Sequence, residues 1–208
     1  MFSGIIESVQ PILSSQQGRG SLVRIKAKKP NEFNDLNIGN SIAVDGVCLT
    51  VEAFDAEAIT FALAAETLQV LKWSPENPEK LVGRKLNLER SLRFGDRIHG
   101  HLVTGHVDSL GLVKKSESSG ENHLLEIEVA ASVLPFLWSK GSITLNGVSL
   151  TVNQVRDSVV SVGLIPETLK RTNLGDLKAG NFVNVEPDYM AKALRRMMET
   201  QNFKEVGL

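Results

Sequence analysis

Two segments of the chain are nearly identical: VDGVCLTV at positions 44–51 and LNGVSLTV at positions 145–152. Equivalent residues in the two segments, such as Cys48 and Ser149, lie 101 positions apart, which is about half of the 208 residues. The one marked chemical difference is a thiol in the first segment and a hydroxyl in the second. A repeat of this length restricts the chain to folds that contain two similar units.

The repeat extends well beyond these two segments. The same shift of 101 aligns SGIIES with TGHVDS and AETL with PETL, while a shift of 97 aligns GRKLNLE with GNFVNVE. The drop from 101 to 97 implies four extra residues in the first half, in the proline-containing loop at 73–79. Four blocks in the same order with one insertion indicate an internal duplication. We therefore expect two domains, 1–97 and 98–187, followed by an unrepeated tail at 188–208.

Each half has the pattern of β structure. SIAV and VCLTVEAF, separated by Asp-Gly, are typical of a hairpin, because Asp-Gly and Asn-Gly favour tight two-residue turns. Further alternating or β-branched runs predict strands at 21–27, 58–64, 85–89, 123–129, 159–165 and 181–187. About six short strands per half predict an all-β fold of two homologous closed barrels with a Greek-key-like order, since closure removes exposed sheet edges. Within the halves, only short helices are expected, at 66–72, 131–138 and 167–171.

The tail has a different pattern from the two halves. Met190, Ala193, Leu194, Met197 and Met198 recur at helical spacing, which predicts a C-terminal α-helix with one apolar face. Asp188 is a suitable N-cap for this helix. Three apolar faces of this kind would bury one another, so 188–208 is expected to be an oligomerisation helix.

Composition excludes several functional classes. The chain is 42% hydrophobic and 23% charged with a formal net charge of −1, which gives no electrostatic reason to expect nucleic acid or an anionic membrane as partner. The sequence contains no apolar run long enough to span a membrane and no signal peptide at its start, so a cytoplasmic protein is expected. One cysteine rules out an internal disulfide and a cysteine-based metal site.

Five motifs together resemble the riboflavin synthase family: MFSGIIE, DGVCLTV, GHLVTGHVD, NGVSLTV and LIPETLKRT. The resemblance covers essentially the whole chain. It implies two six-stranded barrels with one lumazine-binding site each, and a C-terminal helix that assembles a homotrimer. It also implies a transferase that needs no metal or organic cofactor. Two molecules of 6,7-dimethyl-8-ribityllumazine would exchange a four-carbon unit, giving riboflavin and 5-amino-6-(D-ribitylamino)uracil. Lumazine synthase is a further partner that the resemblance suggests.

The family's binding positions fall on equivalent segments of the two halves, at the same shift of 101. The first half supplies Gly4, Ile5, Ile6, Cys48, Leu49, Thr50, Ala62, Leu63, Ala64, Ala65, Glu66 and Thr67. The second half supplies Gly105, His106, Val107, Lys140, Ser149, Leu150, Thr151, Gly163, Leu164, Ile165, Pro166, Glu167 and Thr168. Glycine at 4 and 105 would allow the backbone to approach a flat ring, and Thr50 and Thr151 supply hydroxyls for a ribityl chain. For any one of these residues, ordinary turn formation or barrel packing is the alternative explanation.

The implied reaction requires different work from the two pockets. One lumazine must lose a proton from its 7-methyl group, and the other must be activated at C7. The informative residues are therefore those at which the copies differ: Cys48 against Ser149, Phe2 against Val103, His106 against Ile5, and Asp188 against Ser91. With Lys140 as a further support, the candidate catalytic residues are Phe2, Ser41, Cys48, His101, His106, Ser149 and Asp188.

Each of these candidates has an alternative interpretation. Cys48 could be a nucleophile, a polar contact or a small buried side chain. His101 and His106 could act as general acid or base, and in a strand their odd spacing would place them on opposite faces. They lack a third ligand for a metal, and Asp188 could be only a helix cap. The alternative function is a non-catalytic antenna protein of the same fold that binds lumazine or flavin; the two intact signatures favour the synthase.

Overall fold

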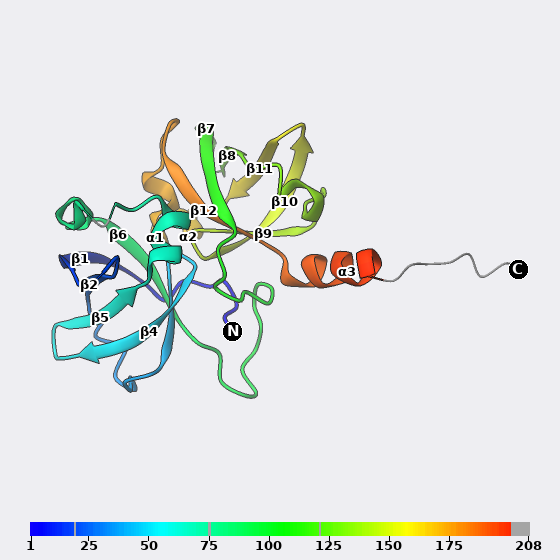
Figure 1. Cartoon of the computed structure of the whole chain (residues 1–208). Helices are drawn as coiled ribbons and strands as arrows, with labels where there is room; N and C mark the ends of the chain where they lie inside the picture. Colours follow the sequence, from blue (N-terminus) through cyan, green and yellow to red (C-terminus); the bar gives the residue numbers. More distant parts are fainter. Residues whose placement is uncertain (19, 75, 121, 201–208) are drawn as a thin grey trace, which may run out of the picture.

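The computed structural model describes residues 1–18, 20–74, 76–120 and 122–200, and these form two closed antiparallel barrels of six strands each (Figure 1). The first barrel contains β1 (Ser8–Gln17), β2 (Val23–Lys28), β3 (Ser41–Val44), β4 (Val47–Phe54), β5 (Ala58–Leu63) and β6 (Lys85–Arg90). The second contains β7 (Ser109–Ser119), β8 (Asn122–Glu128), β9 (Ser142–Leu145), β10 (Val148–Arg156), β11 (Val159–Leu164) and β12 (Phe182–Pro187). The strand order β1-β2-β5-β4-β3-β6 recurs in the second barrel, which confirms the predicted fold class.

Both predicted hairpins are present. Asp45-Gly46 joins β3 to β4, and Asn146-Gly147 joins β9 to β10. All four turn residues have positive φ, 47° and 81° in the first turn and 46° and 81° in the second. Two consecutive positive φ values are the geometry of the type I′ turn, which matches the twist of the flanking strands.

Strand alternation separates a core face from an outer face in each barrel. On β4, Val47, Leu49 and Val51 are buried in the core of the first barrel, whereas Cys48 and Thr50 lie on the outer face. A register shift interrupts β4 between Val51 and Ala53, and the equivalent shift occurs in β10. Because such bulges bend a strand sharply, their recurrence helps to close both barrels in the same way.

Two of the three predicted helices within the halves are present. They are α1 (Ala65–Leu71) and α2 (Pro166–Arg171). The helix predicted at 131–138 is wrong, because the chain there forms only the 3₁₀ turn η2 (Leu134–Phe136). Pro135 lacks the N–H that a longer helix would use. Two further 3₁₀ turns are η1 (Pro78–Leu81) and η3 (Asn173–Asp176).

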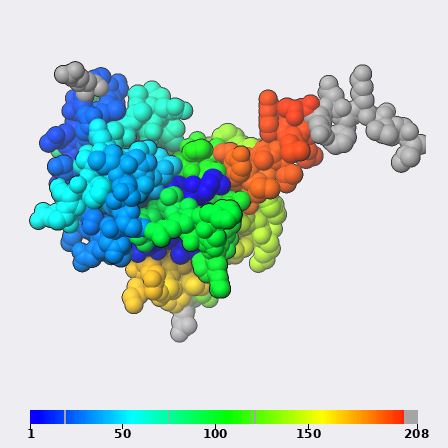
Figure 2. All heavy atoms as spheres, turned by 90° about the horizontal axis from the view of Figure 1, so that it is seen from below, coloured from blue at the N-terminus to red at the C-terminus, as the bar shows by residue number. Residues whose placement is uncertain are grey.

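The tail forms α3 (Tyr189–Thr200), which projects away from both barrels in Figures 1 and 2. Asp188 caps it as predicted, since its Oδ1 accepts a hydrogen bond of 2.8 Å from the N–H of Met190. The predicted apolar face is exposed on the single chain: Leu194 and Met198 are 57% and 69% accessible. The remainder of the predicted tail, 201–208, lies outside the described residues. Across the described ranges, no helix is long and apolar enough to cross a membrane.

Equivalent residues of the two halves touch each other, which defines an approximate two-fold axis between the barrels. Phe2 and Val103, which the repeat aligns, form an antiparallel bridge with N–H to oxygen distances of 2.8 and 3.0 Å. The two hairpin turns also meet, because a Cβ atom built on Gly46 would lie 2.6 Å from the nitrogen of Gly147. In Figure 2 the blue N-terminal residues lie at this junction, among green residues from the start of the second half.

Candidate active site

Each barrel has a row of small, mostly polar side chains on the outer face of its β3–β4 or β9–β10 hairpin. In the first barrel, Ser41 pairs with Thr50, and Ala43 pairs with Cys48. In the second barrel, Ser142 pairs with Thr151, and Thr144 pairs with Ser149. These rows carry the predicted contacts Cys48, Thr50, Ser149 and Thr151. The structure therefore places the thiol and the hydroxyl at equivalent points of two similar surfaces.

Each row is contacted by a short segment from the opposite half of the chain: 105–107 at the row of the first barrel and 4–6 at the row of the second. The N–H of Cys48 donates to the carbonyl of Gly105, and the N–H of Ser149 donates to the carbonyl of Gly4, both at 2.8 Å. Ile6 belongs to the core cluster of the second barrel, and Val107 packs against that of the first. Segments 4–6 and 105–107 are thus exchanged between the barrels. This corrects the expectation that each half builds its pocket from its own three segments.

The exchange explains the glycines at positions 4 and 105. Their φ values are +76° and +82°, and a Cβ atom on either would lie 2.6 Å from the Cβ of Ser149 or of Cys48, respectively. Glycine is required here because one backbone lies directly against another. The surface that each glycine approaches is a strand of the other barrel, and the approach to a flat ring stays a prediction.

On the first barrel, the predicted binding residues divide between surface and core. Ala64, Ala65 and Glu66 are exposed where β5 leads into α1, and Ala62 and Thr67 are partly buried beside them. The side chains of Leu49 and Leu63 instead point into the barrel core. Any contact that these two leucines make with a ligand on the outer face must therefore involve their backbone. The exposed side chain of His106 adjoins this surface, because it follows the Gly105 that contacts Cys48.

The second barrel repeats this division. Gly163, Pro166 and Glu167 are exposed and Thr168 is partly buried, while Leu150 and Leu164 lie in the core. Ile5 and Ile165 are large apolar side chains that are nevertheless 46% and 59% exposed. Exposed isoleucines on a polar-rimmed face are suited to contact with a flat ring. Lys140 is exposed, and its N–H donates at 2.8 Å to the carbonyl of Val152, on the strand that carries Ser149 and Thr151.

His101 lies on the second of these surfaces. Its Nδ1 is 2.7 Å from the Oγ of Ser149, and its Nε2 is 3.1 Å from the Oγ1 of Thr144. A neutral imidazole can satisfy both hydroxyls, one as donor and one as acceptor. Burial lowers the pKa of His101 from its ordinary value, although the carboxylates of Asp188 and Glu186 oppose this shift. The ring is therefore neutral near pH 7 and able to accept a proton.

The two histidines lie in an irregular segment, so the strand that would have placed them on opposite faces is absent. In 101–108 only Val103 forms a bridge, and the rest of the segment is irregular. His101 and His106 are nevertheless separated, because His101 contacts Ser149 of the second barrel and the residue before His106 contacts Cys48 of the first. The predicted separation arises from the exchange of segments, not from strand alternation. Asp188 joins the His101 group through its electrostatic effect as well as capping α3.

Phe2 is fully buried between the barrels, against Ala43, Val103 and Cys48. This changes its predicted role. A side chain with no exposed surface cannot stack on a ligand, so it would act by fixing the N-terminal segment next to Cys48. The packing of Cys48 against Phe2 also supports the interpretation of the thiol as partly a packing residue.

Two residues that the sequence reasoning missed are Glu89 and Glu186, the equivalent acids near the ends of β6 and β12. Each accepts hydrogen bonds from the opening Ser-Gly or Thr-Gly of its own half. Burial raises the pKa of Glu89 to about 6. The sequence signal for them was their equivalent position at the end of the aligned blocks GRKLNLE and GNFVNVE. An acid that both copies have at the end of a strand predicted to be buried needs a hydrogen-bond partner.

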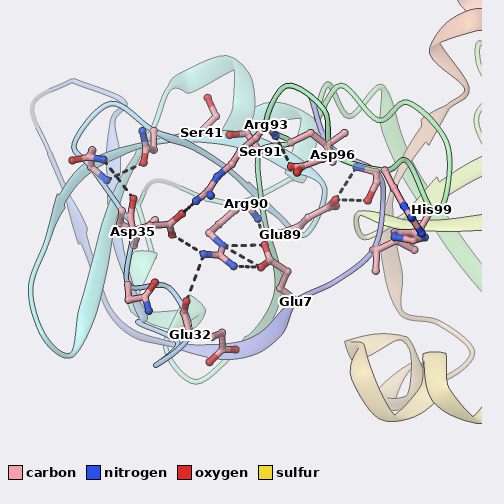
Figure 3. A pocket seen from close by; sticks show the side chains of 18 residues that line it. Glu7, Glu32, Asp35, Ser41, Glu89, Arg90, Ser91, Arg93, Asp96 and His99 are labelled. Atoms are coloured by element: carbon pink, nitrogen blue, oxygen red, sulfur yellow. Dashed lines mark hydrogen bonds and ion pairs between the residues drawn. The ribbon is translucent and has the colours of Figure 1, made fainter.

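A polar cavity of about 1070 Å³ lies next to Glu89 and contains Ser41, Ile5 and His99 among its lining residues (Figure 3). Arg90 forms ion pairs there with Glu7 and with Asp35, and the Arg90–Asp35 contact is 2.6 Å. The cavity is adjacent to the first row through Ser41. Within the described part of the chain, no group of three or more His, Cys, Asp or Glu residues is arranged to hold a metal ion.

Comparisons with known proteins identify the family of the chain. The lumazine binding domain family matches residues 3–91 and 104–188. Proteins named riboflavin synthase are similar over nearly the full length: that of Chlamydia trachomatis serovar D is 38% identical, with 92% of each chain covered, and that of Actinobacillus pleuropneumoniae is 36% identical, with 95% and 90% covered.

Solved structures of LumP share the fold at lower identity. The LumP complex with 6,7-dimethyl-8-(1'-D-ribityl) lumazine has a TM-score of 0.77 and 22% identity, covering 90% of this chain and 99% of LumP. The LumP complex with riboflavin has a TM-score of 0.79 and 24% identity over the same shares. At this identity the likeness concerns the fold alone.

Proposed function

The chain belongs to the riboflavin synthase family of transferases, and on that premise we propose that its two outer faces each bind one molecule of 6,7-dimethyl-8-ribityllumazine. The observation that carries this proposal is the pair of equivalent surfaces that differ in their reactive groups. One has Cys48 and the other has Ser149 backed by His101. A reaction between two copies of one substrate needs similar recognition and different chemistry at the two sites.

The reaction that we propose is a dismutation. One lumazine loses a proton from its 7-methyl group, the other gives up four carbons, and the products are riboflavin and 5-amino-6-(D-ribitylamino)uracil. On the second face, a neutral His101 can take a proton directly or through the hydroxyl of Ser149, 2.7 Å away. On the first face, Cys48 and His106 offer a thiol and a second imidazole, with Ser41 and Thr50 beside them.

Positioning supplies much of the proposed rate enhancement. Holding two reactants in a productive orientation can account for roughly 7 to 11 kcal/mol of a barrier, whereas a single acid or base typically contributes about 10²- to 10⁴-fold. The exposed Ile165 offers a flat contact for a ring on the second face. The polar residues are therefore expected to be individually important without being indispensable.

We propose a homotrimer as the active assembly, in which the first barrel of one subunit faces the second barrel of its neighbour. Support comes from α3, whose apolar residues are exposed on the single chain. A groove of about 550 Å³ between α3 and the η2 region, lined by Pro135, Trp138, Leu194 and Met198, extends this apolar surface. Ligands on outward-facing surfaces could meet only if two such surfaces are brought together.

The direct test is to mix purified protein with 6,7-dimethyl-8-ribityllumazine and follow riboflavin by its fluorescence and absorbance. One riboflavin should appear for every two lumazine molecules consumed. A matched Cys48→Ser variant, which places in the first copy the residue that the second copy already has, should bind the lumazine and turn over more slowly. Binding without any riboflavin formation by the unaltered protein would reject the proposal in favour of the antenna function.

A further inference from the structure

Glu89 and Glu186 hold the two exchanged segments in the same way. The Oε1 of Glu89 accepts from the N–H and Oγ of Ser3 at 2.7 and 2.9 Å, and its Oε2 accepts from the N–H of Gly4 at 3.0 Å. The Oε1 of Glu186 accepts from the N–H and Oγ1 of Thr104 at 2.8 and 2.6 Å, and its Oε2 accepts from the N–H of Gly105 at 3.1 Å. Both glutamates are buried, at 3% and 2% exposure.

The hydrogen-bonded chain that starts at each glutamate ends on the opposite barrel. Glu186 belongs to β12 of the second barrel, but the Gly105 that it holds accepts from the N–H of Cys48 in the first. Glu89 belongs to β6 of the first barrel, but the Gly4 that it holds accepts from the N–H of Ser149 in the second. In Figure 3 the side chain of Glu89 lies between Arg90 and His99, with its hydrogen bonds dashed.

We propose that the two glutamates are crossed positioning residues. Glu186 of the second barrel sets the geometry around Cys48 on the first, and Glu89 of the first barrel sets the geometry around Ser149 and His101 on the second. The effect of these glutamates on catalysis rests on the proposed function. The hydrogen-bonded connection from each glutamate to the other barrel does not.

The physical reason lies in the number of buried donors that each carboxylate satisfies. Thr104 is 8% exposed, so its N–H, its hydroxyl and the N–H of Gly105 have little access to water. Without an acceptor these donors favour a position of the segment that lets water in, since leaving them unpaired is unfavourable. This movement would draw Gly105 away from Cys48 and weaken the 2.8 Å hydrogen bond from the N–H of Cys48 to the carbonyl of Gly105.

Cys48 provides a reporter of this geometry because it is the chain's one cysteine. The experiment measures the rate at which iodoacetamide modifies Cys48 in the full-length protein without substrate, in Glu186→Gln and in Glu89→Gln. A glutamine keeps the length of the side chain but replaces one acceptor with a donor. Loss of a charge-assisted hydrogen bond should raise the population of the displaced segment, and with it the modification rate, about tenfold in Glu186→Gln. Glu89→Gln should stay within about twofold of the unaltered protein, because Phe2, which follows Met1 and packs against Cys48, keeps its own bridge to Val103.

Comparing the Cys48 modification rates of the two glutamine variants is decisive, because an effect that acted only within one barrel would accelerate modification in the other variant. Glu89 and Cys48 lie in one barrel and both flank Ala43, whereas Glu186 lies in the other barrel. A local effect of the substitution would therefore accelerate modification in Glu89→Gln. Turnover alone cannot replace the thiol measurement, because the charge of Glu186 also acts on His101.

A gentler pair of variants covers the case in which a glutamine variant does not fold, as judged by its thermal unfolding. Thr104→Val removes the 2.6 Å hydroxyl bond to Glu186 and keeps the side-chain shape, and Ser3→Ala removes the corresponding bond to Glu89. Thr104→Val should raise the Cys48 modification rate about threefold and Ser3→Ala should not change it.

Adding 6,7-dimethyl-8-ribityllumazine separates the two levels of the inference. It should protect Cys48 from modification in Ser3→Ala and protect it less in Thr104→Val. Absence of protection in the unaltered protein would count against the proposed function, while the rates without ligand still test the crossed link. Equal rates in all variants, or a faster rate in the Glu89 and Ser3 variants than in the Glu186 and Thr104 variants, would overturn the crossed assignment.

Discussion

Gly46→Ala should destabilise the protein much more than an alanine at a glycine of the same backbone conformation elsewhere. Gly46 has φ of +81°, and an added Cβ would lie 2.6 Å from the nitrogen and 2.9 Å from the Cα of Gly147. Gly83 has φ of +84°, and an added Cβ would have no heavy atom within 4 Å. Gly83→Ala is therefore a matched control for the backbone strain alone.

The structure allows the two effects to be estimated separately. A left-handed conformation costs an alanine about 1 to 2 kcal/mol, and this applies to both variants. At Gly46 the opposing atoms belong to a backbone, so the two hairpin turns must move apart. That movement weakens two bonds across the axis, from Asn184 Nδ2 to the carbonyl of Asp45 at 2.8 Å and from Asn87 Nδ2 to the carbonyl of Asn146 at 2.9 Å. With roughly 1 kcal/mol for each, Gly46→Ala should cost about 3 to 4 kcal/mol in total.

Urea unfolding followed by tryptophan fluorescence can locate the effect, because Trp73 reports on the first barrel and Trp138 on the second. A Trp138→Phe background leaves Trp73 as the one tryptophan. Gly147→Ala should match Gly46→Ala, since its added Cβ would lie 2.8 Å from the nitrogen of Gly46. If Gly46→Ala and Gly83→Ala differ by less than about 0.5 kcal/mol, the turns do not pack as described and the account of the barrel interface is incorrect.

Three further outcomes are expected. Burial raises the pKa of Glu89 from its ordinary 4.5 to about 6, so between these pH values the folded state binds more protons than the unfolded state. Protonated Glu89 therefore contributes about 2 kcal/mol to the free energy of unfolding below pH 4.5, and this contribution is lost as the pH rises through 6. Unfolding measured as a function of pH should show a smaller dependence of stability on pH in Glu89→Gln. Because burial lowers the pKa of His101, turnover should persist to a lower pH than an ordinary histidine would allow. If the fall of turnover at low pH is the same in His101→Gln, another group is responsible for it. Removal of residues 189–208 should yield monomers by light scattering, since it removes the exposed apolar face of α3; a trimer that survives this deletion would place the subunit contacts elsewhere.

Much of the fold follows from local sequence. The 101-residue repeat predicted two similar domains, and the alternation of apolar side chains predicted their strands. Asp45-Gly46 and Asn146-Gly147 predicted both hairpins, because these dipeptides accept positive φ at both positions at little cost. The helix at 131–138 failed because helical spacing in a short window carries little weight against a proline within it.

The sequence proposed residues for the candidate site but did not indicate how their segments assemble. The sequence indicated Cys48, Ser149 and the glycine segments, but it suggested that Gly4 would lie with Cys48 in one half. The structure pairs Gly4 with Ser149 and Gly105 with Cys48. It also shows that Phe2, one of the candidate catalytic residues, is buried at the axis.

The reason for this difference is that the two copies offer nearly the same partners. Ser3-Gly4 and Thr104-Gly105 carry the same donors and acceptors, and Cys48 and Ser149 each present a strand N–H to receive a glycine carbonyl. Local sequence preference is therefore almost equal for pairing within a half and pairing between halves. Only the arrangement of the two barrels decides between them. With the hairpin turns in contact and Phe2 bridged to Val103, the start of each half is hydrogen-bonded to the glutamate of its own half and also reaches the row of the other barrel.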